Sequence, residues 1–257
     1  MPHGESWFSF LPNYEALLHL ARGLSEPVSR DGLSWYAHQP IGIQHVLGLV
    51  LVLIVLAILG GVAFVQVRKA HEAIAPEESF TVRTFMELFT GYVYDSMAEM
   101  MGKRAAKFFL PLIGTCAFVI FFSNVLGLVP FFPVPTSNLN TTFAMALLIF
   151  FSTHVFGVKE HGLVYFKHYF GPVWWLAPLM LPIELISHIA RPITLAVRLM
   201  ANMTADHLVL GIFLSLVPWI VPLPLYFLGC IVVTVQTLVF CLLSTVNISM
   251  AIAPHEH

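Results

Sequence analysis

Apolar residues occur along this chain in long runs that charged residues rarely interrupt. The segments 43–67, 108–158 and 207–255 contain no Asp, Glu, Lys or Arg. A helix that spans a membrane needs about 20 apolar residues. We therefore predict one spanning helix in 43–67 and two in 108–158, because the turn-rich stretch 130–140 divides the second run.

The last third of the chain is apolar too, but its first half carries charges. The segment 171–206 contains four of them: Glu184, Arg191, Arg198 and Asp206. Prolines at 218, 222 and 224 separate it from the apolar run 225–253. We predict two long membrane helices in 171–253, and hence an all-α integral membrane protein with about five membrane helices.

The segment 79–107 has a different pattern and is predicted to be an amphipathic helix. Apolar side chains recur at helical spacing on one side, namely Val82, Phe85, Met86, Phe89, Val93, Met97 and Met100. Charged side chains fall on the other side, namely Arg83, Glu87, Asp95 and Glu99. Such a helix lies on the membrane surface or against a partner. The alternative is that it covers the protein's own loops.

Composition narrows the class of protein further. Hydrophobic residues make up 58% of the 257 residues and charged residues 10%, whereas soluble domains carry about 25% charged residues. This argues against a soluble enzyme and against disorder, and the net charge of −2 argues against a nucleic-acid surface. Three cysteines lie in apolar runs and are interpreted as core hydrophobes: Cys116, Cys230 and Cys241. We expect no cofactor and no metal site.

The distribution of basic residues predicts the topology. Residues 1–42 contain two basic residues and four acids, whereas 68–107 contains six basic residues. By the positive-inside rule the second segment is cytoplasmic. The N-terminal segment 1–42 is then extracytoplasmic and the C-terminus cytoplasmic, with 43–257 forming a single membrane domain.

Polar side chains between 184 and 206 gather on one side of the predicted helix. At 100° per residue, six of them lie within about 80° of one another: Glu184, His188, Arg191, Arg198, Asn202 and Asp206. Each charge inside a membrane costs about 2.5–3.5 kcal/mol, so these groups must face water or a partner. For Glu184 and Arg191 the alternative is an i,i+7 pair near a helix end. His188 and His207 could each be satisfied core histidines.

Arg198 suits a specific task, because its guanidinium stays charged under all physiological conditions. It can attract a partner's carboxylate and hold it deprotonated, and it blocks direct passage of cations. Protonatable groups lie on both sides of it, Glu184 and His188 before it and Asp206 and His207 after it. Histidine suits proton relay. This order describes two half-channels separated by a charge barrier.

The final segment adds Gln236, and then Ser244 and Asn247, in otherwise apolar sequence. The Gln236 amide could bind Arg198 or channel water. The alternative is an interhelical hydrogen bond, which is common in membrane proteins.

Several stretches resemble subunit a of bacterial F-type ATP synthases. The run 194–203 (TLAVRLMANM) resembles the arginine-bearing segment of that family. In the same order, 123–130 (SNVLGLVP), 135–140 (PTSNLN) and 159–162 (KEHG) resemble other stretches of it. Gln236 lies where the family's final helix carries a glutamine.

The resemblance implies a non-catalytic, proton-conducting stator subunit of the membrane sector in a bacterial inner membrane. Its partners would be a ring of c subunits, the b subunits of the peripheral stalk, lipid and, indirectly, the catalytic head. Arg198 matches the arginine that meets the ring carboxylate and Gln236 its neighbour. Asn202 and His207 match the outer half-channel, and Glu184 the opposite one. The last two helices would form a tilted hairpin along the ring.

The chain departs from the family's pattern at three positions. Ala201 stands where glycine is common, and Asp206 adds an acid at a usually small position. Gly229, seven residues before Gln236, stands where many relatives carry a histidine or an acid. We hypothesise that Asp206 compensates for the group missing at Gly229.

Two other classes of protein are weighed against this interpretation. One is a secondary transporter that binds a small anion at Arg198. The other is an intramembrane enzyme, which would need a nucleophile–base pair or a metal triad. His71-Glu72 lacks the second histidine of a zinc motif. His154 and His161 lie at i,i+7 without an acid on their face.

Overall fold

The computed structural model describes residues 14–19, 44–69, 81–129, 132, 134–161, 177–216 and 222–252. These residues form helices and short connections, with no strand among them. The elements are α2 (Gln44–Lys69), α3 (Val82–Met101), α4 (Lys103–Leu128), the 3-10 turn η2 (Pro135–Ser137), α5 (Leu139–His161), α7 (Ala177–Leu216) and α8 (Pro222–Ile252). Of the N-terminal segment 1–42, only the short helix 14–19 lies in the described part.

Five helices are long and apolar enough to cross a membrane, which confirms the predicted number. They lie at His45–Arg68, Lys103–Leu128, Leu139–Lys159, Met180–Leu214 and Leu223–Ile252. The protein is therefore an all-helical, multi-pass membrane protein. The remaining long helix, α3, is the amphipathic one.

The amphipathic helix ends six residues before the bound of the predicted segment. We gave the segment as 79–107, but α3 ends at Met101 and α4 begins at Lys103. Gly102 between them has a φ of 81°, a conformation that side chains with a Cβ rarely adopt. Its N–H donates to Ala98 O and its C=O accepts from Ala106 N–H. The apolar pattern itself ends at Met100, since the next positions on that side, 104 and 107, are Arg and Lys.

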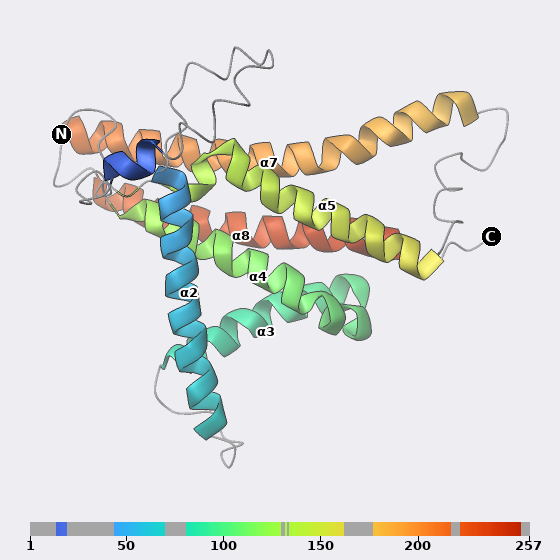
Figure 1. The fold of residues 1–257 in the computed structure, drawn as a ribbon, viewed down its shortest axis with the longest axis horizontal. Coiled ribbons are helices and arrows are strands. Elements are labelled where there is room, and N and C mark those ends of the chain that lie inside the picture. Colours follow the sequence, from blue (N-terminus) through green and yellow to red (C-terminus); the bar gives the residue numbers. More distant parts are fainter. Residues whose placement is uncertain are drawn as a thin grey trace.

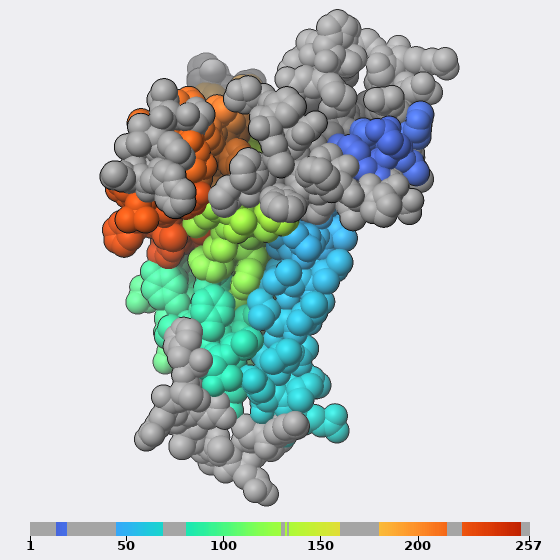
Figure 2. All heavy atoms as spheres, turned by 90° about the vertical axis from the view of Figure 1, so that its left-hand side faces the viewer, coloured from blue at the N-terminus to red at the C-terminus, as the bar shows by residue number. Residues whose placement is uncertain are grey.

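Helix α4 lies in the centre of the bundle. It contributes to two buried clusters, one with α5, α7 and α8 and one with α3 and α8. Figure 1 shows that α5, α7 and α8 extend in a similar direction, whereas α2 runs steeply across them. In Figure 2 α2 forms one side of the molecule beside α3. Because α2 crosses α7 and α8 steeply (Figure 1), these helices cannot all stand upright in one membrane. This agrees with the expectation that α7 and α8 are tilted relative to the membrane normal.

The connections predicted to lie on the same side of the membrane contact one another. Asn138, after η2, approaches His45 at the start of α2, and Thr204 on α7 donates to Ser137 O. At the other end of the bundle, Ser249 on α8 donates to Met100 O near the α3–α4 junction. The contacts at both ends of the bundle are thus consistent with the side of the membrane predicted for each connection.

One prediction about the cysteines fails. Cys116 and Cys241 are buried as expected, but Cys230 is exposed on α8. Spanning helices are apolar on every face, so sequence does not distinguish a residue that faces the core from one that faces outward.

Candidate functional site

Helix α7 carries most of the predicted site. Its buried positions repeat every three or four residues and pack on α4, α5 and α8: Leu195, Ala196, Leu199, Met203 and Leu210. Pro192 lies inside the helix and leaves the His188 carbonyl without its usual N–H donor. Figure 1 shows α7 bending along its length, for which this proline is a sufficient cause.

The opposite face of α7 is not covered by other described parts of the chain. Large apolar side chains are exposed on it, for example Ile193 (44%), Val197 (42%) and Leu208 (60%). Arg198 emerges on this uncovered face, is exposed, and forms no hydrogen bond or ion pair with any described residue. A permanent charge on an apolar face needs a partner from outside the chain or access to water.

Asn202, one turn after Arg198, links α7 to α8. Its Nδ2 donates to Gln236 Oε1 at 2.7 Å, and Gln236 is buried (5% exposed). Of the alternatives for Gln236, the structure therefore contains the interhelical hydrogen bond. This bond fixes the two helices to each other directly beside Arg198.

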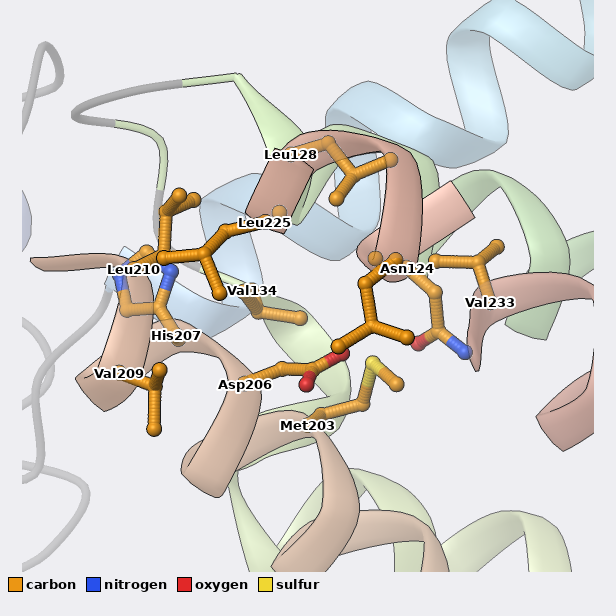
Figure 3. Close-up of a pocket in the computed structure, with 13 residues that line it drawn as sticks. Asn124, Leu128, Val134, Met203, Asp206, His207, Val209, Leu210, Leu225 and Val233 are labelled. Atoms are coloured by element: carbon orange, nitrogen blue, oxygen red, sulfur yellow. The ribbon is translucent and has the colours of Figure 1, made fainter. Parts of the chain in front are cut away.

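A first polar pocket lies between α4, α7 and α8 on the C-terminal side of Arg198. We call it the Asp206 pocket; its polar lining consists of Asn124, Asp206 and His207. Figure 3 shows the Asp206 carboxylate in the middle of the pocket, with His207 on one side and Asn124 on the other. The pocket has about 60 Å³ of space, and one water needs about 10–15 Å³, so a few waters fit.

Asn124 has a fixed orientation in this pocket. Its Oδ1 accepts a hydrogen bond from Thr136 Oγ1 at 2.6 Å. Its Nδ2 is buried and has no partner among the described residues. A buried donor without a partner is costly, so the amide is suited to bind water or the nearby carboxylate. We did not predict Asn124 as a site residue, although it lies in the family-like run 123–130.

A second polar pocket lies between α5, α7 and α8 on the N-terminal side of Arg198. We call it the His188 pocket; its polar lining consists of Thr153, His154, His188, Arg191 and Asn247. It has about 20 Å³ of space, enough for a single water. His188 Nε2 lies 3.4 Å from Glu184 Oε1. The alternative ion pair between Glu184 and Arg191 is not formed within the described chain.

The structure thus sorts the predicted residues into three groups along α7. Asp206 and His207 share one pocket, and Glu184 and His188 form a pair beside the other. Arg198 lies between them and lines neither pocket, with the Asn202–Gln236 bond next to it. Sequence reasoning did not assign the side chains from other helices to the site, namely Asn124, His154 and Asn247, since only packing brings them to α7.

Known proteins were compared with the chain. The family model described as ATP synthase A chain matches residues 48–249. The chain belongs to the ATP synthase subunit a family. It is 43% identical over 244 residues to "ATP synthase subunit a" of Sorangium cellulosum, covering 94% of this chain and 96% of the relative.

Other relatives of the ATP synthase subunit a family are similarly close. "ATP synthase subunit a 1" of Syntrophotalea carbinolica is 46% identical over 199 residues, covering 77% of this chain and 82% of the relative. "ATP synthase subunit a" of Geobacter sulfurreducens is 46% identical over 167 residues, covering 65% of this chain and 72% of the relative. Membership of this family confirms the resemblance and agrees with a role in ATP synthesis and ion transport.

The departure at Gly229 lies in the Asp206 pocket. Gly229 lines this pocket, and a Cβ at that position would lie 2.6 Å from Leu128 Cδ2. The end of the Leu128 side chain therefore lies where a side chain at position 229 would begin.

Proposed function

We propose that this chain is the proton-conducting stator subunit of the membrane sector of an F-type ATP synthase. It passes protons through two half-channels to and from the carboxylates of a ring of c subunits, and the chain itself makes no covalent bond. The observation that carries the proposal is the position of Arg198 between two separate polar pockets, on an apolar face where no described residue pairs with it or covers it.

The uncovered face of α7 suits a ring whose carboxylates pass Arg198 one at a time. The fixed guanidinium charge favours the ionised carboxylate opposite it. The ring site then releases its proton on one side of Arg198 and accepts another on the other side. Because Arg198 cannot lose its own proton, it separates the two paths instead of joining them.

The Asp206 pocket supports an outer half-channel and the His188 pocket a cytoplasmic one. In this assignment Asp206, His207 and Asn202 serve the outer path, while Glu184 and His188 serve the cytoplasmic path. Gln236 holds Asn202 beside Arg198 through the 2.7 Å bond. The N-terminus is then outside, the C-terminus cytoplasmic and the membrane the bacterial inner membrane. The b subunits of the peripheral stalk and, indirectly, the catalytic head complete the set of partners.

An anion transporter is the weaker alternative. Such a protein would enclose its ligand near the bilayer centre, with most of the ligand surface buried. Arg198 is exposed and lines neither of the two polar pockets. The exposed position favours a large, moving partner over a small enclosed ligand.

Inverted membrane vesicles carrying the whole ATP synthase test the proposal. We expect Arg198→Ala to abolish ATP-driven proton pumping while the head still hydrolyses ATP. Val197→Ala, on the same exposed face, is the matched control and should pump normally. Unchanged pumping by Arg198→Ala would refute the assignment, and so would pumping that depends on an added anion.

A further inference from the structure

His154 brings a second imidazole to the His188 pocket from a different helix. Its ring on α5 packs against the His188 ring on α7 with 5.6 Å between centroids and planes 72° apart. Both rings line the pocket, together with Arg191 and Asn247. Two ionisable rings in contact inside a membrane bundle indicate a function, because buried polar groups there are costly.

The backbone sets the proton positions on His154. Its Nδ1 lies 2.9 Å from Phe150 O. A carbonyl oxygen only accepts hydrogen bonds, so Nδ1 carries the hydrogen. In the neutral ring Nε2 therefore has a lone pair and is ready to accept a proton.

His188 continues the line of titratable groups towards Glu184. His188 Nε2 lies 3.4 Å from Glu184 Oε1. The His188 side chain is 14% exposed and the Glu184 side chain 35%. Exposure therefore increases from His188 to Glu184, as expected where a buried path meets water.

We propose that His154, His188 and Glu184 form a proton relay between α5 and α7, with His154 as an additional relay residue. The inference rests on the proposed function, because it names a member of one of the two half-channels. A proton binds the Nε2 lone pair of His154 and leaves as an N–H bond forms on His188, directly or through one water. His188 then gives a proton to the Glu184 carboxylate, and both rings return to the neutral form.

The charges around the pocket fit a relay that holds one extra proton at a time. Arg191 supplies a fixed positive charge to the pocket from α7, and the polar group facing it from α8 is the neutral Asn247. Two imidazolium rings beside an arginine would repel strongly. Among the described residues, no group of three His, Cys, Asp or Glu is arranged to hold a metal ion, so a shared metal does not explain the cluster.

The test uses vesicles with the whole complex, and the same vesicles stripped of the head for passive proton conduction. We expect His154→Gln to lower conduction by about a hundredfold near neutral pH, at the lower end of general acid–base effects. It should also remove part of the dependence of the conduction rate on pH. In His154→Ala vesicles, added imidazole should restore conduction. A purely structural role would change neither the pH profile nor the response to imidazole.

Two controls keep the outcomes distinct. Val155→Ala, at a neighbouring position with 62% exposure, should conduct normally, and Arg198→Ala should fail in ATP-driven pumping with or without imidazole. An unchanged rate and pH profile in His154→Gln would overturn the relay while leaving the Arg198 result intact. The relay is also wrong if both His154 variants assemble in normal amounts, conduct slowly and show no imidazole rescue. Normal ATP-driven pumping by Arg198→Ala would instead overturn the proposed function itself.

Discussion

The two polar pockets on either side of Arg198 are built in different ways. The Asp206 pocket has about 60 Å³ of space and contains glycines at 127 and 229 among its lining residues. The His188 pocket has about 20 Å³ and is the gap left between rings and branched side chains. At both glycines a neighbouring side chain already lies where a Cβ would be, Val134 at 127 and Leu128 at 229. The Asp206 pocket is suited to several waters and the His188 pocket to side-chain relay.

The two pockets also differ in the polar groups that line them. The Asp206 pocket contains a carboxylate, an amide and one imidazole, whereas the His188 pocket contains two imidazoles, a guanidinium and an amide. Only the His188 pocket therefore holds a fixed positive charge, and only the Asp206 pocket has a carboxylate in its lining.

The largest effect is expected at Gly127, which lines the Asp206 pocket. A Cβ on Gly127 would lie 2.5 Å from Val134 Cγ2 and 3.2 Å from Cγ1. Valine is stiff at χ1 and cannot turn away easily, so Gly127→Ala should destabilise the subunit by about 1–3 kcal/mol. Thermal unfolding of the purified membrane sector measures this. Gly229→Ala is the matched control, because it meets only the flexible end of Leu128 and should unfold within a few degrees of the unsubstituted protein.

The next effect concerns the acid of the Asp206 pocket. Asp206→Asn keeps the shape of the side chain but removes its capacity to carry a proton. We expect passive proton conduction to fall by about a hundredfold, and His207→Ala to cost less, since Gly229 leaves Asp206 without a neighbouring acid or histidine on α8. Conduction by head-stripped vesicles measures both variants. If Asp206→Asn conducts normally while His207→Ala does not, the idea that Asp206 compensates for Gly229 is wrong.

A smaller effect is expected from the hydrogen bond that orients the amide of the same pocket. Thr136→Val removes the donor to Asn124 Oδ1 while keeping the side-chain volume. The Asn124 amide is then free to turn, and we expect a loss in conduction of about three- to fivefold, the equivalent of about 1 kcal/mol for one neutral hydrogen bond. Thr136→Ser retains the hydroxyl and should conduct normally. Equal losses in both variants would indicate that packing, and not the orientation of Asn124, is what matters.

Sequence predicts the helices well, for a physical reason. Long charge-free runs determine the number of spans, and a charged residue in a long apolar segment stands out, as Arg198 does. His154 looks unimportant beside His161, since its neighbour in space is His188 on another helix. Asn124 is oriented by Thr136, and only the folded bundle brings that pair to Asp206. What a single helix displays is predictable, whereas what several helices build together is not.

The smallest effect is expected at the exposed end of the His188 pocket. Glu184 is 35% exposed on its side chain and lies 3.4 Å from His188 Nε2, so water can replace much of what its carboxylate provides. Glu184→Gln should therefore lower conduction by only about twofold, in keeping with the weak net value of exposed charge pairs. Conduction by head-stripped vesicles measures this. A loss as large as that of Asp206→Asn would show that the two pockets rely equally on their acids, and the contrast between a water-filled pocket and a side-chain relay would then have to be abandoned.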